Sequence, residues 1–331
     1  RETAHFALPW QQQLQQSFNT INDLCHYLNL NPTKLNLSET ASEQFALRVP
    51  LSFAACIEKN NPQDPLLKQV LPIHDELQHH EDYTLDPVGD LAAAIQTGVL
   101  HKYQGRLLLI NTGSCAINCR YCFRRNFPYS EFQLTKQQQD LALKTIADNQ
   151  SIQEVIFSGG DPLLLNDQRL SYFIEQLNQI THVKRIRIHS RIPIVLPARI
   201  TTEFLNTLNL SQKKIVLVVH CNHANELNPR VYQACQRLKQ QGISLLNQAV
   251  LLNGINNDAK TLCELSEKLF DYGILPYYLH LLDKAQGTAH FEVNKIEALQ
   301  LINEVQNQLS GYLVPKLVQE ISGMQAKQTV K

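Results

Sequence analysis

The stretch that decides the fold is residues 106–127, "RLLLINTGSCAINCRYCFRRNF". It opens with an apolar run that has the length and composition of a buried β-strand. Three cysteines follow in a C-x3-C-x2-C spacing, at Cys115, Cys119 and Cys122. A strand that runs into a long, cysteine-rich segment indicates a loop that carries chemistry.

Similar short apolar runs recur downstream, starting near residues 154, 183, 214, 244 and 275. After the long first interval they return about every 30 residues, with amphipathic segments between them. One strand plus one helix fills such an interval, and strands connected in this way are parallel. The pattern predicts an α/β fold of six strand–helix units, either a partial (β/α)6 TIM-like barrel or an open parallel sheet.

The first hundred residues have a different character. Residues 10–30, "WQQQLQQSFNTINDLCHYLNL", carry apolar side chains at helical spacing, and five prolines interrupt residues 50–87. No strand pattern is convincing there. We expect a mainly helical and irregular region over 1–100, the barrel over 101–310 and a C-terminal segment over 311–331.

Composition limits the classes of partner. The 331 residues hold 30 basic and 30 acidic side chains, and this zero net charge argues against nucleic acid or an anionic membrane as partner. No apolar run has the length of a bilayer span, and the first residues hold no apolar signal core. The cysteines outside the cluster are irregularly spaced, so a disulfide framework is not expected. These features favour the reducing cytoplasm.

Three clustered cysteines leave several sites open. A structural zinc site uses four ligands, so a distant histidine would have to complete it. A [4Fe–4S] cluster held by three thiolates keeps one iron open to a small molecule. A redox-active thiol cluster is the third possibility. Histidines at strand ends (His189, His220, His223, His280 and His290) are expected to line or support a cavity.

The spacing and its place after a first barrel strand are similar to those of the radical S-adenosylmethionine (SAM) superfamily. Within it, the chain resembles the lysine 2,3-aminomutase family over roughly residues 100–330. The segments that carry this resemblance, in order, are "LHKYQGRLLLI", "CRYCFRRNF", "FSGGDPLL", "RIHSRIPIVLPARIT", "HCNHANEL" and "LLDKAQGTAHF". "FALRVPLSF", "DPLLKQVLP" and "GYLVPKL" resemble the branch whose product modifies elongation factor P.

The resemblance implies an isomerase that converts L-lysine to (R)-β-lysine with a [4Fe–4S] cluster, SAM and pyridoxal 5′-phosphate (PLP). It also implies an electron donor such as flavodoxin or ferredoxin, and a ligase that attaches the product to elongation factor P. A catabolic lysine 2,3-aminomutase, or an aminomutase of another amino acid, remains an alternative. So does a zinc-stabilised or redox-sensing barrel without radical chemistry.

The resemblance also implies roles for single residues. The cluster is assigned to Cys115, Cys119 and Cys122, and SAM to Tyr121, Ser158, Gly159, Gly160 and Asp161. PLP is assigned to Lys327 as the Schiff-base lysine, with Lys102, Arg106 and Gln248 beside it. The substrate is assigned to Arg124 for the carboxylate and to Asp283 and Glu320 for the side-chain ammonium.

The segment before Lys327 departs from the family pattern. A run of glycines is replaced here by residues 322–326, "SGMQA", and Glu320 stands where the family has Asp. Lys316 is the fallback candidate for the PLP lysine. Asp283 favours a cationic substrate, because a carboxylate attracts an ammonium group.

Overall fold

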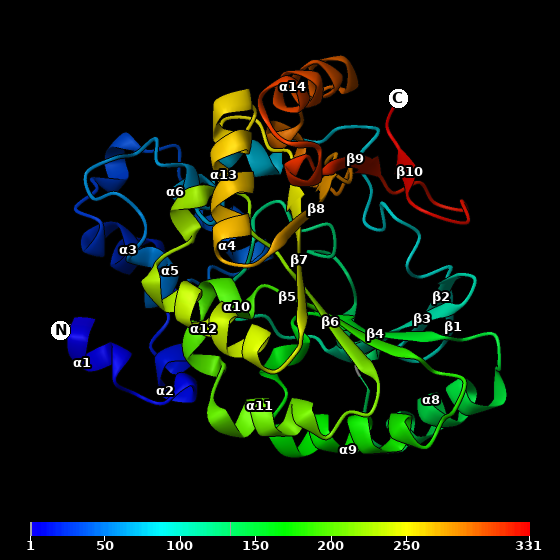
Figure 1. Cartoon of the computed structure of the whole chain (residues 1–331). Coiled ribbons are helices and arrows are strands. Elements are labelled where there is room, and N and C mark those ends of the chain that lie inside the picture. Colours follow the sequence, from blue (N-terminus) through cyan, green and yellow to red (C-terminus); the bar gives the residue numbers. More distant parts are fainter. Residues whose placement is uncertain (1, 133) are drawn as a thin grey trace.

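The computed structural model describes residues 2–132 and 134–331, and Figure 1 shows their arrangement. In this part of the chain, ten strands form one sheet whose spatial order, β1 to β10, is also the order in the sequence. Seven consecutive strands are parallel. They are β3 (Arg106–Thr112), β4 (Glu154–Gly159), β5 (Arg185–Ser190), β6 (Lys214–Val219), β7 (Ser244–Val250), β8 (Leu275–His280) and β9 (Lys316–Gln319).

The six predicted strands are confirmed as β3 to β8, and the α/β class with them. The expectation of no strand before residue 100 was wrong, because β1 (Ala94–Gln96) and β2 (Val99–Tyr103) pair antiparallel with each other and with β3. At the other end, β9 adds a seventh parallel strand and β10 (Gln328–Thr329) pairs antiparallel with it. These additional strands are short, so they leave little periodicity to detect.

Helices connect the strands and cover the outer face of the sheet (Figure 1). The larger ones are α8 (Lys136–Asp148), α9 (Asp167–Asn178), α11 (Thr202–Asn209), α12 (Pro229–Gln240), α13 (Ala259–Asp271) and α14 (Lys295–Gln308). Each begins after a Thr, Asn or Asp whose side chain accepts a hydrogen bond from a backbone N–H of the first turn. Two short helices, α7 (Tyr129–Phe132) and α10 (Ile192–Val195), lie in loops.

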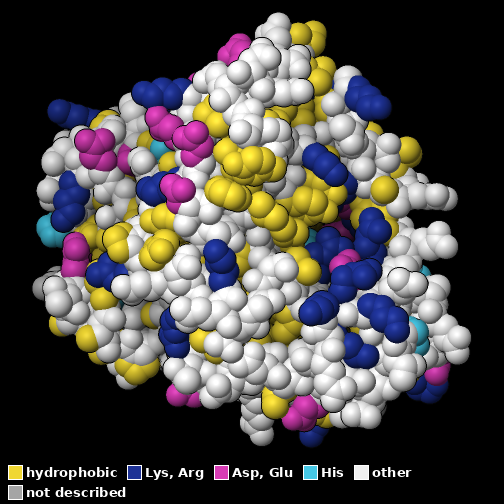
Figure 2. Space-filling model, in the orientation of Figure 1, with side chains coloured by type: hydrophobic (Ala, Val, Ile, Leu, Met, Phe, Trp, Pro, Cys, Tyr) yellow, Lys and Arg dark blue, Asp and Glu magenta, His cyan; other side chains and the backbone are white. Residues whose placement is uncertain are grey.

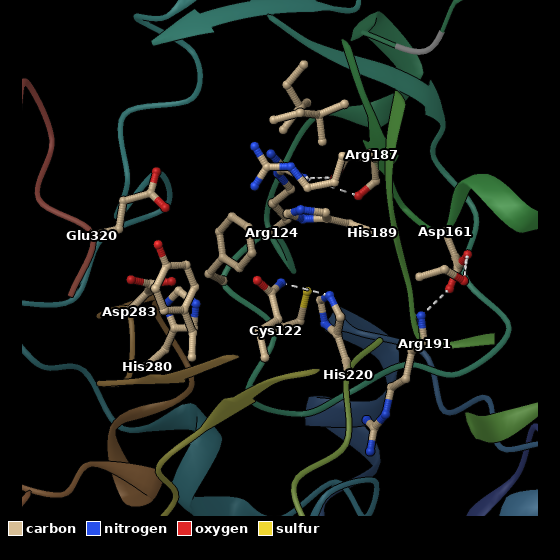
Figure 3. A pocket seen from close by; sticks show the side chains of 18 of the residues that line it. Cys122, Arg124, Asp161, Arg187, His189, Arg191, His220, His280, Asp283 and Glu320 are labelled. Atoms are coloured by element: carbon tan, nitrogen blue, oxygen red, sulfur yellow. Dashed lines mark hydrogen bonds between the residues drawn. The ribbon is translucent and has the colours of Figure 1, made fainter. Parts of the chain in front are cut away.

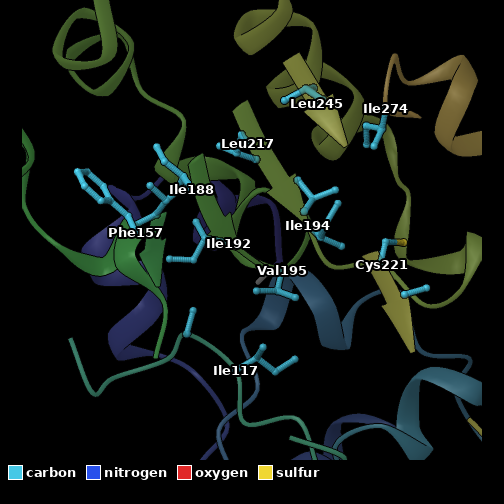
Figure 4. Close-up of a cluster of buried hydrophobic side chains, with 14 of the residues drawn as sticks. Ile117, Phe157, Ile188, Ile192, Ile194, Val195, Leu217, Cys221, Leu245 and Ile274 are labelled. Atoms are coloured by element: carbon cyan, nitrogen blue, oxygen red, sulfur yellow. The ribbon is translucent and has the colours of Figure 1, made fainter. Parts of the chain in front are cut away.

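The regular structure of the N-terminal region before β1 consists of short helices joined by irregular segments. Its helices are α1 (Glu2–Phe6), α2 (Trp10–Gln15), α3 (Ile21–Tyr27), α4 (Glu39–Gln44), α5 (Leu51–Ala54) and α6 (Pro65–Lys68). Buried residues of this region, such as Leu24 and Phe53, belong to the same hydrophobic core as Ile188 and Val195 of the barrel. Figure 4 shows the barrel part of that core, between the strands and the loop helix α10. No helix among the described residues is long and apolar enough to cross a bilayer.

Candidate active site

A cavity of about 610 Å³ lies inside the curved sheet, and its size suits an organic cofactor with substrate. Figure 2 shows its opening as a hollow bordered by Lys and Arg side chains, between β9–β10 and β2–β4. All of the site residues assigned from the sequence line it. These are Lys102, Arg106, Cys115, Cys119, Tyr121, Cys122, Arg124, Ser158, Gly159, Gly160, Asp161, Gln248, Asp283, Glu320 and Lys327. Lys316 is exposed at the start of β9 and is absent from the lining of this cavity.

The three cysteines of the loop after β3 are free, half-buried thiols. Burial first, then the neighbouring thiols, raises the pKa of Cys115 well above its usual range, and the same causes raise the pKa of Cys122 to about 11. Arg191 Nη1 donates to Cys119 Sγ at 2.7 Å. Thiols that oppose one another's ionisation become good ligands once a positively charged group binds between them.

Two arginines tie this loop to the N-terminal region through one buried carboxylate. Arg120 donates to Glu76 from Nε at 2.9 Å and from Nη2 at 2.6 Å, and Arg125 Nη2 donates to the same carboxylate at 2.6 Å. Arg125 also reaches the Gly287 carbonyl at 3.0 Å. Of the adjacent pair that follows the cysteines, Arg125 therefore serves the packing of the loop and Arg124 faces the cavity.

The turn after β4 needs its glycines. Gly159 has a φ of +116°, and a Cβ on Gly160 would lie 2.3 Å from the Ser114 carbonyl oxygen. The Asp161 carboxylate accepts hydrogen bonds from Ser190 Oγ at 2.7 Å and from the Arg191 N–H at 2.8 Å. Burial raises the pKa of Asp161 to about 6. The turn thus packs its backbone against the cysteine loop, and Asp161 connects it to the end of β5.

An ionic network that the sequence did not reveal centres on Asp90. Its carboxylate, which is 2% exposed, accepts from Lys102 Nζ and from Arg124 Nε, each at 2.6 Å. Arg124 Nη1 also donates to Ser158 Oγ at 3.1 Å, and Lys102 to Glu320 Oε1 at 3.0 Å. The sequence offers no signal for Asp90, because it lies in an irregular segment far from its partners along the chain.

The C-terminal segment brings Lys327 into the cavity, where it approaches the same Glu320 carboxylate that Lys102 contacts. Its Nζ lies 3.3 Å from His280 Nε2 and 3.9 Å from Glu320 Oε2. Burial lowers the pKa of Lys327, so more of the amine is neutral and nucleophilic near pH 7. Burial and then Glu320 raise the pKa of Asp283 to about 7, and Asp283 forms no ion pair with another described residue.

The described walls of the cavity also carry groups that were not assigned from the sequence. His189, His220 and His280 line it as expected, whereas His223 and His290 do not. Burial lowers the pKa of all three cavity histidines, that of His220 to about 3, so they are neutral. Figure 3 shows Asp283, Glu320 and His280 on one side and Arg124, Arg187 and His189 on another. Asp283 and Arg124 thus lie in different parts of the cavity, where they could contact groups of opposite charge on one ligand.

Several known proteins have sequences similar to this one. A profile of the radical SAM superfamily matches residues 109–265. An L-lysine 2,3-aminomutase of Escherichia coli (strain K12) is 47% identical over 319 residues, which cover 96% of this chain and 93% of that protein. The enzyme of the same name from Haemophilus influenzae is 48% identical, over 92% of this chain and 91% of its own length. The one from Clostridium subterminale is 34% identical, over 95% of this chain and 76% of its own length.

Proposed function

This chain belongs to the L-lysine 2,3-aminomutase family of radical SAM enzymes, and on that premise we propose that its cavity converts free L-lysine to (R)-β-lysine. The observation that carries the choice of substrate is Asp283. The carboxyl group of Asp283 is half-buried and has no ion pair among the described residues, so a ligand cation would stabilise it as a carboxylate. The side-chain ammonium of lysine supplies that cation, and an acidic or apolar amino acid does not.

The residues present fit the cofactors of the family. Cys115, Cys119 and Cys122 would hold the [4Fe–4S] cluster, with Tyr121 and the turn 158–161 beside it for SAM. Lys327, with its lowered pKa, would hold PLP. When bound, the cluster and SAM supply a carbon radical that removes a hydrogen atom from the substrate, and PLP activates the amino group for migration.

The chain's own contribution is to position the substrate and exclude water. Arg124 would hold the substrate carboxylate, because a guanidinium group binds a carboxylate through two parallel hydrogen bonds. Asp283 and Glu320 would hold the side-chain ammonium at the opposite wall. The neutral histidines and buried aromatic rings such as Tyr121 keep the reacting region dry, which protects a radical from side reactions.

We further propose that the product serves the modification of elongation factor P, and that a flavodoxin or ferredoxin supplies the electron. The support for this role is the resemblance of the outer segments to that branch. The chain is 47% identical to the Escherichia coli relative and 34% identical to the Clostridium subterminale relative. A catabolic role is the alternative.

Activity is tested by anaerobic incubation of the protein with SAM, PLP, dithionite and L-lysine, with β-lysine as the readout. We expect Cys119→Ala to abolish SAM cleavage. We expect Lys327→Ala to lose PLP while keeping the cluster, and Lys316→Ala to keep both. PLP retained by Lys327→Ala but lost by Lys316→Ala would move the assignment to Lys316. A colourless protein that holds zinc after anaerobic purification would refute the radical mechanism.

The cellular role needs a separate experiment. In a strain that lacks the gene, the intact mass of elongation factor P should lack the β-lysyl group, and the Cys119→Ala variant should not restore it. Unchanged elongation factor P together with a growth defect on lysine as nitrogen source would favour the catabolic alternative.

A further inference from the structure

The guanidinium group of Arg191 is fixed from two sides in the wall of the cavity. Its Nη2 donates to Glu226 Oε2 at 2.9 Å and to Gln69 Oε1 at 2.7 Å. The backbone N–H of Arg191 donates to Asp161, and Figure 3 shows the side chain extending away from that carboxylate. The side chain is 6% exposed, so water hardly competes for these bonds. Arg191 is therefore held in one orientation.

The two groups that hold Arg191 are themselves held by the loop after β6. Glu226 Oε1 accepts from the N–H groups of Asn222 and His223, at 3.0 and 3.2 Å, and from Gln69 Nε2 at 3.0 Å. Gln69 Oε1 also accepts from Asn222 Nδ2 at 3.1 Å. Both oxygens of Glu226 and both polar atoms of Gln69 are thus satisfied. A buried network that is satisfied in this way is rigid.

The third contact of this guanidinium group is with a cysteine of the cluster loop. Nη1 of Arg191 donates to Cys119 Sγ at 2.7 Å. Among the described residues, no other cationic side chain donates to a sulfur of the three cysteines. Arg48 lies close to the same loop, but its Nη1 donates to the Cys115 carbonyl oxygen, at 3.1 Å. One of the three sulfurs that would bind iron therefore receives a hydrogen bond from a buried cation.

A hydrogen bond to a ligand sulfur stabilises the reduced cluster more than the oxidised one. Reduction by one electron adds a negative charge, which the iron atoms share with the sulfide and thiolate sulfurs. An N–H group of a buried cation that points at such a sulfur stabilises the added charge. Hydrogen bonds to the sulfurs are accordingly among the factors that set the potential of an iron–sulfur cluster. The Glu226 carboxylate acts in the opposite direction, because it offsets the charge of Arg191.

We propose that Arg191 donates to Cys119 in the cluster-loaded protein and raises the reduction potential of the cluster, and that Glu226 and Gln69 are positioning residues that direct Arg191 to this sulfur. The inference rests on the proposed function, because it takes a [4Fe–4S] cluster as resident. The electron comes from the one-electron donor of that function, and Arg191 itself is neither oxidised nor reduced.

The test is a redox titration of the anaerobically reconstituted protein, without SAM or PLP, followed by the electron paramagnetic resonance signal of the reduced cluster. We expect Arg191→Met to make reduction about tenfold less favourable, which for one electron is a potential about 59 mV more negative. The double variant Arg191→Met/Glu226→Gln leaves no buried charge unpaired, so it should fold and show the same direction of change. Glu226→Gln alone should move the potential in the positive direction, because the charge of Arg191 is no longer offset.

Arg48→Met is the matched control. Arg48 is half-buried beside the cysteine loop, but it donates to a backbone oxygen and not to a sulfur. The variant therefore loses a nearby positive charge without losing an N–H···S bond. Its equilibrium constant for reduction should stay within about threefold of wild type, because a partly exposed charge is screened. Circular dichroism and iron content establish that each variant is folded and loaded before the titration.

An unchanged potential in Arg191→Met with full iron content would overturn the proposal. So would equal shifts in Arg191→Met and Arg48→Met, because they would mark a general effect of charge. Loss of the cluster in both Arg191→Met and the double variant would show that Arg191 builds the site and does not set its potential, and would overturn the proposal as well. A wild-type protein that takes up no iron would instead refute the proposed function, so the two failures are distinguishable.

Discussion

At the scale of single residues, the cavity depends on buried charges whose partners lie far away in the sequence. Asp283 could be assigned from its motif, "LLDKAQGTAHF", whereas Lys327 was assigned by its position, because the segment before it departs from the family pattern. Asp90 and Arg191 could not, because their roles arise from contacts with Lys102, Arg124 and Cys119 that only the folded chain creates. The sequence therefore offers candidates for the residues that would touch the ligands, but it gives no signal for Asp90, which holds Lys102 and Arg124 in place.

Asp283 should make substrate binding depend on pH. Its pKa is raised to about 7, so it is protonated below that value and becomes a carboxylate above it. Only the carboxylate attracts the lysine ammonium, so kcat/KM should rise between about pH 6 and about pH 8. Asp283→Asn should flatten this rise and increase the KM for lysine about tenfold or more. Asp82→Asn changes an 82% exposed group and should keep the wild-type profile. If kcat/KM of Asp283→Asn still rises with pH as in the wild type, Asp283 is not the group whose ionisation causes the rise.

Asp90 should be important for stability as well as for the site. Asp90→Asn leaves the buried Arg124 and the half-buried Lys102 without their carboxylate and should lower the free energy of unfolding by about 3–5 kcal/mol in urea titrations. Asp86→Asn is the matched control, because Asp86 accepts only backbone hydrogen bonds, from the N–H groups of Asp90 and Leu91. Asp86→Asn should lower the free energy of unfolding by about 1 kcal/mol. Equal losses in the two variants would argue against a special role for the ion pairs.

At the scale of elements, the strands that could be predicted are those whose outward side chains are buried under helices. In β5 and β7 buried residues alternate with half-buried ones, several of which line the cavity. The sequence of β10 is only "QT", and β9 is "KLVQ", so hydrogen bonds to a neighbouring strand define them more than their own composition. The same holds for β1 and β2.

The contact between the turn after β4 and the cysteine loop should be sensitive to one methyl group. Gly160→Ala places a Cβ 2.3 Å from the Ser114 oxygen, and backbone atoms have to move. Because Ser114 precedes Cys115, we expect iron content and the absorbance of the cluster to fall more than twofold after reconstitution. Gly311→Ala meets no atom within 4 Å and should bind iron like the wild type. Normal iron content in Gly160→Ala would show that the loop adapts.

At the scale of the whole molecule, the N-terminal region and the barrel share one hydrophobic core, and Glu76 joins them through Arg120 and Arg125. The boundary near residue 100 stays a prediction, which was drawn from the change in hydrophobic pattern along the sequence. Removal of the buried carboxylate in Glu76→Gln should lower the free energy of unfolding by about 3–5 kcal/mol, measured in urea. Glu58→Gln, which affects a hydrogen bond at the surface, should change it by less than about 0.5 kcal/mol.

The shared core also predicts a single unfolding transition. Trp10 is the one tryptophan, and its ring lies 4.8 Å from the guanidinium carbon of Arg199, so its fluorescence reports on the contact between the two regions. Circular dichroism reports mainly on the barrel helices. The two signals should change at the same urea concentration, as one cooperative unit requires. Separate transitions would show that residues 1–100 form an independent domain.

The spatial order of the strands also sets the order in which the pocket is completed during synthesis. Lys327 follows Cys122 by 205 residues, and translation adds about 5–20 residues per second. The three thiols thus leave the ribosome roughly 10–40 seconds before the lysine that completes the opposite wall. During that interval no finished cavity shelters them from oxidants, and thiolates that can be reached by solvent are the ones that oxidise. The three cysteines are therefore most exposed to oxidation while the chain is still being synthesised.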